Sequence, residues 1–153
     1  MQKLAAVEEA KSLMREAIDW SLWGWLTEKR RLRTTADRAW AALEEQEAKV
    51  KASWSQELKA AYRSLGSRNG KPRTIPAELL DAVHRLKEAE EQADAAHMEA
   101  EDTFDLADRR MSTSMACEGA RQAIAAWEMR EKVIRKAESL GRKMSAESPP
   151  AQS

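Results

Sequence analysis

The stretch Gly66-Ser67-Arg68-Asn69-Gly70-Lys71-Pro72-Arg73-Thr74-Ile75-Pro76 separates two long runs of helix-forming residues. Its two glycines, its Asn-Gly pair and its two prolines are typical of a helix C-cap, a tight turn and a helix start. Residues 2–65 and 77–144 contain no proline, and little in them stops a helix. The sequence therefore predicts two helical arms, residues 2–65 and 77–144, joined by a turn over residues 66–76.

The composition agrees with an all-α protein, because charged residues form 34% of the chain and there are only 5 glycines and 4 prolines. We expect one helical domain over residues 1–144 and a disordered tail over residues 145–153. The 26 basic and 26 acidic residues cancel, so no overall field is expected to attract nucleic acid or a membrane. No segment approaches the roughly 20 apolar residues of a membrane span, and we expect a cytoplasmic protein.

Apolar residues recur at spacings of three and four along both arms, which predicts a coiled coil. One such seam covers residues 79–111 and is interrupted by Glu90 and His97. A matching seam covers residues 36–65 of the first arm and is interrupted by Glu47. Two narrow seams of this kind favour a long antiparallel helical hairpin that folds back at the turn.

Folding back at the turn predicts which residues face one another. Trp40 is expected opposite residues 100–104, and His97 is expected near residues 44–47. A buried contact between His97 and a glutamate there would fix the register of the two arms.

The ends of both arms remote from the turn carry more apolar surface than one partner helix covers, and soluble monomers rarely expose such patches. A second copy of the chain would cover it if two hairpins paired through their distal halves into a four-helix bundle. The alternative is a compact monomeric four-helix bundle whose arms break near residues 33–36 and 112–115, where Thr and Ser are suitable caps. We favour the continuous hairpin and the homodimer, because neither break contains Gly or Pro. The expected self-association residues are Trp20, Trp23, Trp25, Trp127 and Ile134.

Two Asp-x-x-His pairs, Asp81 with His84 and Asp94 with His97, raise the question of a metal site. Di-iron bundles place such pairs on two different helices and add glutamates from two others, whereas both pairs here lie on one arm. We therefore expect structural histidines and no metal or cofactor. No nucleophile elbow, phosphate loop or Cys-x-x-Cys motif is present, so we expect no enzyme.

Two basic clusters could contact phosphates, namely the turn with Arg68, Lys71 and Arg73, and the segment Lys29–Arg33. The turn has no aromatic residue for base stacking, which favours solvated surface charge. The sequence thus predicts a non-enzymatic scaffold or adaptor that self-associates and has an unknown protein partner. The alternatives are a nucleic-acid-associated accessory protein that uses both basic clusters and, third, a helical-bundle metal protein.

Overall fold

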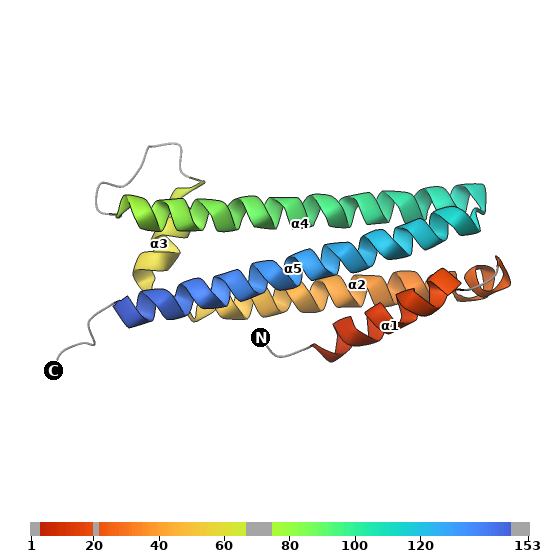
Figure 1. The fold of residues 1–153 in the computed structure, drawn as a ribbon, viewed down its shortest axis with the longest axis horizontal. Coiled ribbons are helices and arrows are strands. Elements are labelled where there is room, and N and C mark those ends of the chain that lie inside the picture. The colour runs from red at the N-terminus through yellow and green to blue at the C-terminus, as the bar shows by residue number, and fades with distance from the viewer. Residues whose placement is uncertain (1–3, 20–21, 67–74, 148–153) are drawn as a thin grey trace.

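The computed structural model describes residues 4–19, 22–66 and 75–147, with backbone alone for Asp19, residues 22–28 and residues 145–147 (Figure 1). All secondary structure in these residues is helical, which confirms the all-α prediction. The helices are α1 (Ala5–Asp19), α2 (Leu22–Ala52), α3 (Gln56–Ser64), α4 (Ala77–Arg110) and α5 (Thr113–Glu147).

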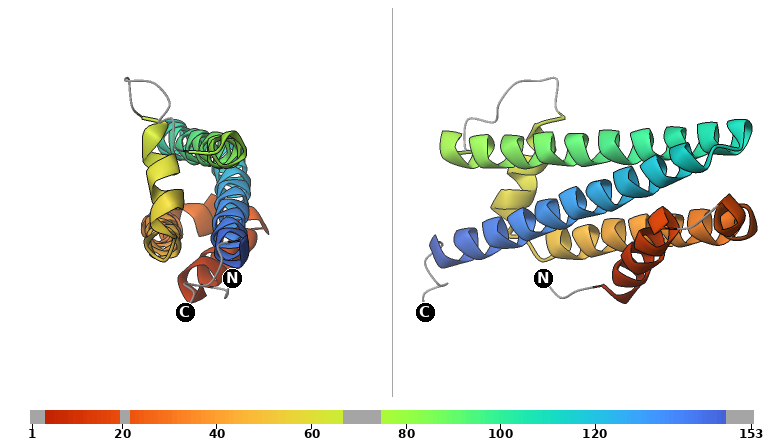
Figure 2. Two further views of the ribbon diagram at one scale, coloured as in Figure 1. Left: turned by 90° about the vertical axis from the view of Figure 1, so that its left-hand side faces the viewer. Right: turned by 45° about the vertical axis from the view of Figure 1, so that its right-hand side comes forward.

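The long helices α2, α4 and α5 form the body of an elongated bundle (Figures 1 and 2). Helix α4 runs antiparallel to both α2 and α5, and α1 folds back along α2 and α5. The short helix α3 crosses from the end of α2 to the start of α4. Helices α4 and α5 are closest at the turn that joins them, and they diverge toward the end where α3 lies, which we name the α3 end.

The first arm is not one continuous helix, because α2 stops at Ala52 and α3 starts at Gln56. Between them Trp54 turns into the core, where it is 4% exposed, and its indole N–H donates to the Ala137 carbonyl oxygen at 2.9 Å. Ser55 then caps α3, since its hydroxyl accepts a hydrogen bond from the Leu58 N–H at 3.3 Å. The break therefore combines a local cap with a distant acceptor on α5.

The second arm also breaks, as the alternative fold predicted for residues 112–115. Helix α4 ends at Arg110, and its C-cap residue Met111 adopts the left-handed conformation with φ 49° and donates its N–H to the Ala107 carbonyl oxygen. Ser112 begins the next helix, because its hydroxyl accepts from the Met115 N–H at 3.2 Å.

The predicted break near residues 33–36 is wrong, because α2 continues through them. Leu32 and Ala39 on either side are fully buried, so packing holds this stretch in helix against the modest helix propensity of threonine. In the described residues of the first arm, α1 ends at Asp19, α2 begins at Leu22, and α1 folds back along α2. The hairpin of two unbroken arms is thus corrected to a bundle of shorter helices. Helix α5 also continues to Glu147, three residues past the expected end of the second arm at residue 144.

The predicted seams do form the core. Seven apolar seam residues of α4 are at most 5% exposed, whereas Met111 at its end is 60% exposed. The buried seven are Leu79, Val83, Leu86, Ala93, Ala100, Phe104 and Ala107. Helix α1 packs on α2 and α5, and its Val7 and Met14 are 1% and 0% exposed. None of the described helices is long and apolar enough to cross a bilayer.

Candidate interaction surface

A cluster of ion pairs lies inside the bundle, where α2, α4 and α5 meet. Arg130 on α5 places its Nε 3.0 Å from one Glu47 carboxylate oxygen and its Nη2 3.1 Å from the other. Its Nη1 is 2.7 Å from Asp94 of α4. Glu47 and Arg130 are only 5% and 7% exposed, so this pairing neutralises two buried charges.

The same cluster continues toward α3 through Lys51. Its Nζ lies 3.0 Å from Glu47, pairs with Glu90, and donates a 3.0 Å hydrogen bond to the Tyr62 hydroxyl. The Tyr62 hydroxyl in turn donates to Glu90. Lys51 also lies 4.2 Å from the centroid of the Tyr62 ring.

The pKa shifts follow from this burial and pairing. Burial raises the pKa of Glu47, assisted by the nearby Glu90 charge and opposed by Lys51. Burial alone would lower the pKa of Lys51, but hydrogen bonds to Glu90, Tyr62 and Glu47 raise it above its usual value. Burial and the hydrogen bond to Glu90 raise the pKa of Tyr62. Because the charges of these groups neutralise one another, we assign the cluster a structural role.

The two histidines are paired along α4. Nε2 of His84 lies 3.0 Å from Glu88, and Nε2 of His97 lies 3.1 Å from Glu101. The His97 ring also stacks on Trp40 with centroids 4.0 Å apart. This contact is about one helical turn from the residues predicted to face Trp40.

The predicted His97–glutamate contact with α2 is wrong, because Glu47 is occupied by Arg130 and Lys51. In residues 4–19, 22–66 and 75–147 no group of three His, Cys, Asp or Glu side chains is placed to hold a metal ion.

Basic and acidic residues are equal in number in the sequence, but they are distributed unevenly over the folded bundle. The helical residues at the α3 end carry eleven Lys and Arg against six Asp and Glu, counted over residues 49–64, 77–88 and 132–147. Three of these cations pair with acids just outside these ranges, and counting Glu45, Glu47 and Glu90 as well leaves eleven cations against nine acids. The remaining helical residues carry eleven basic and twenty acidic residues. The expectation that no field would arise is therefore too simple, since the bundle has a basic end and an acidic body.

A groove lies between α4 and α5 at the basic end, where the two helices diverge. It comprises two adjoining hollows of about 210 and 390 Å³ that share Ala82, Leu140 and Lys143. We name it the α4–α5 groove. Its apolar lining is Leu79, Ala82, Leu86, Leu140 and Met144, and its cationic rim is Arg85, Lys136 and Lys143. One exposed acid, Glu78, also lines the groove at the start of α4, so the rim carries three cations and one carboxylate.

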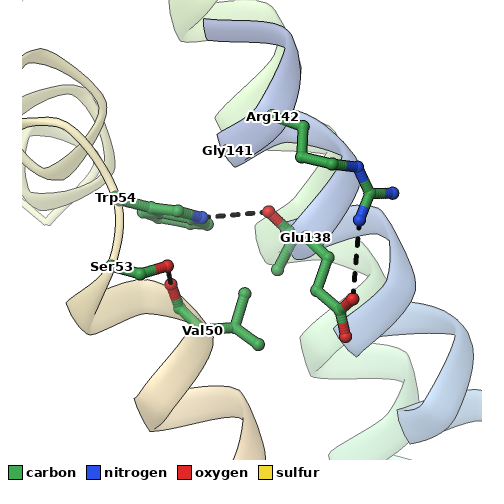
Figure 3. Close-up of a pocket in the computed structure, with 7 residues that line it drawn as sticks. Val50, Ser53, Trp54, Glu138, Gly141 and Arg142 are labelled. Carbon is green, nitrogen blue, oxygen red and sulfur yellow. Dashed lines mark hydrogen bonds and ion pairs between the residues drawn. The ribbon is translucent and has the colours of Figure 1, made fainter. Parts of the chain in front are cut away.

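A second cleft of about 370 Å³ lies between the end of α2 and α5 (Figure 3). Trp54 lies across it toward α5, and Glu138 and Arg142 pair at 3.7 Å on the same helix. The close approach requires Gly141, because a Cβ atom there would come within 2.9 Å of the Trp54 ring. The polar groups of this cleft are thus engaged within the chain, by the hydrogen bond from Trp54 to α5 and by the Glu138–Arg142 ion pair.

A third cleft of about 230 Å³ lies beside α3 and is lined by Lys51, Trp54, Lys59, Tyr62 and other residues of α2 and α3. Lys59 and Arg63 have no ion-pair partner in the described part of the chain. These two cations extend the basic end onto α3.

The structure describes the side chains of only some of the predicted self-association residues. Trp127 and Ile134 are 1% and 0% exposed within a single chain, so neither side chain is left uncovered. Trp20 lies outside the described residues, as do the side chains of Trp23 and Trp25. Self-association through these five residues stays a prediction.

Of the two predicted basic clusters, the structure describes only one. Arg68, Lys71 and Arg73 lie outside the described residues, between α3 and α4. The segment Lys29–Arg33 lies in the first third of α2, about 30 Å along the helix from its end at Ala52. There Arg33 pairs with Asp105 at 3.0 Å and with Asp108 at 3.5 Å.

Comparison with protein families, with curated proteins and with solved structures finds no match to this chain. Its function is therefore inferred from its own geometry and charge.

Proposed function

We propose that the protein is a non-enzymatic adaptor that binds an acidic protein partner through the α3 end of the bundle. The observation that carries this proposal is the excess of cations over anions at that end, with Lys59 and Arg63 lacking an ion-pair partner in the described residues, in a chain whose total charge is zero. Local fields of this kind attract partners of opposite charge and accelerate their association.

The paired state of the buried ionisable groups supports a binding role over catalysis. Glu47, Glu90 and Arg130 are the buried members of the interior cluster, and each has an oppositely charged partner within the bundle. An acid or base for catalysis has to reach a substrate proton, which these enclosed groups do not.

An acidic protein segment is favoured over nucleic acid, which is the second candidate. Single-stranded nucleic acids bind by stacking bases on aromatic faces beside cations. Trp54 is 4% exposed, and the Tyr62 ring carries Lys51 at 4.2 Å and Lys87 at 5.5 Å. The faces of these two aromatic rings at the basic end are therefore already covered by contacts within the chain.

The proposal is tested by fluorescence anisotropy with a labelled glutamate peptide of about 15 residues and an oligothymidylate of similar charge. Replacing Lys59 and Arg63 with Gln should weaken peptide binding about threefold to tenfold, because two exposed charge contacts are lost. The matched control replaces Arg109 and Arg110, exposed at the opposite end of the bundle, with Gln.

Both pairs of substitutions remove two positive charges, so only the position of the charge differs. Equal weakening by both pairs would contradict a binding end. Tighter binding of the oligonucleotide than of the peptide would favour the nucleic-acid alternative.

A further inference from the structure

We propose that the α4–α5 groove binds an acidic amphipathic helical segment of the partner protein. This inference rests on the proposed function and assigns the place and the shape of the ligand. Helices that lay an apolar face into a groove are a common mode of peptide recognition, with anchor residues three, four and seven positions apart.

The groove has the lining that such a segment requires. Its floor contains Ala82, Leu140 and Met144, all of which are partly exposed, so apolar surface is available to a ligand. Two adjoining hollows along the helices give room for successive anchors rather than for a single side chain.

The rim supplies charge at a helical spacing. Lys136 and Lys143 are seven residues apart on α5, so they lie on one face of the helix and about 10 Å apart along it. A helix lying along the groove presents carboxylates at the same separation when its acidic residues are also seven apart. Apolar residues three and four positions after the first acid then point into the groove.

These cations are available to a ligand. Lys136 and Lys143 are exposed, and neither has an ion-pair partner within residues 4–19, 22–66 and 75–147. Arg85 pairs only with Asp81 on its own helix, at 3.1 Å, and both side chains are exposed. Exposed pairs of this kind contribute little, so a partner carboxylate exchanges with Asp81 readily.

The chain's own remaining segments do not complement the groove. Residues 67–74 carry three cations and no acid, and residues 148–153 carry no charged side chain. A second copy offers Met98, which is 54% exposed, among the acidic residues of its α4. A contact between these two surfaces would close as a two-fold dimer or a ring, or grow as an open chain, and in each case the mass would rise with protein concentration.

The test uses the full chain and a labelled helical peptide of about 15 residues, with Glu seven residues apart and Leu at the third and fourth positions after the first Glu. The double substitution Lys136→Glu with Lys143→Glu should weaken binding about tenfold, because attraction becomes repulsion at both rim positions. The matched control is Lys132→Glu with Arg135→Glu, which makes the same charge change at exposed positions of α5 outside the groove.

A second variant, Ala82→Glu, places a longer side chain and a carboxylate inside the groove. It should also abolish most of the binding, while circular dichroism and thermal unfolding should show an intact bundle, since Glu is a good helix former. A peptide with the same acids but Ala in place of Leu should bind less tightly.

An equal loss of peptide binding in the groove pair and in its control would overturn the groove as the binding site. The adaptor proposal would then still be supported or contradicted by the Lys59 and Arg63 substitutions on α3. Unchanged binding to Ala82→Glu would likewise exclude the groove. Mass that grows with protein concentration in sedimentation, and that falls in Ala82→Glu, would assign the groove to a second copy and overturn the proposed partner.

Discussion

Removing Arg130 should destabilise the bundle more than any exposed charge does. Arg130→Met leaves Glu47 buried at 5% exposure with Lys51 as its remaining cation, and Lys51 is shared with Glu90. Breaking a buried ion pair costs about 3–5 kcal/mol. We expect the lower part of that range, about 3 kcal/mol, because Lys51 still contacts Glu47 at 3.0 Å.

In thermal unfolding this loss corresponds to a decrease in Tm of about 6–12 °C for a chain of this size. The matched control is Arg135→Met on the exposed face of α5, which should change stability by about 0.5 kcal/mol or less. Adding Glu47→Gln to Arg130→Met should recover part of the loss, because no charge is then left stranded.

The loss should also depend on pH. The pKa of Glu47 is raised above its ordinary 4.5 by burial, and Arg130 is one of the charges that hold it down. Without Arg130 the folded state binds a proton on Glu47 more readily than the unfolded state does. The deficit of Arg130→Met should therefore shrink as pH falls from neutrality toward 4.5. A loss below about 1 kcal/mol, or a deficit that does not vary with pH, would refute this reasoning.

Three further predictions concern single positions. Gly119→Val should destabilise the bundle by about 1–3 kcal/mol in denaturant unfolding, because even a Cβ there would lie 3.0 Å from the buried Phe104 ring. Met111→Gly should raise stability by up to about 1 kcal/mol, because φ 49° suits glycine and the Met side chain is 60% exposed. Tyr62 is the only tyrosine, so tyrosinate absorbance should appear above pH 10 in the folded protein and at the ordinary pKa of 10.0 after unfolding. Since the folded pKa is the higher one, Tyr62 should make unfolding easier as pH rises past 10.0.

Spacing of apolar residues predicted the buried face of α4 well, because a helix places every third or fourth residue on one side whatever it packs against. The Ser112 cap was predictable for the same reason, since its hydrogen bond to Met115 is local. The break at Trp54 was not predictable from the sequence, because the carbonyl oxygen that accepts its indole N–H belongs to Ala137, 83 residues further along the chain.

The candidate site was predicted less well than the fold. Glu47 and Glu90 could be recognised as polar interruptions of two facing seams, and Lys51 follows Glu47 by four residues on the same helix. Arg130, however, could not be recognised as the partner of Glu47. Arg130 reaches both α2 and α4 from α5, and that contact depends on how three helices are arranged. The basic end depends in the same way on where each helix turns back, so adding up charges along the sequence conceals it.

The length of the bundle has an electrostatic consequence in physiological salt. The 31 residues of α2 extend over about 46 Å, whereas the Debye screening length is about 8 Å. A charged partner near one end is thus screened from most of the opposite charge. The protein behaves toward such partners as two separate surfaces of opposite sign, and a measured isoelectric point near neutrality would describe neither of them.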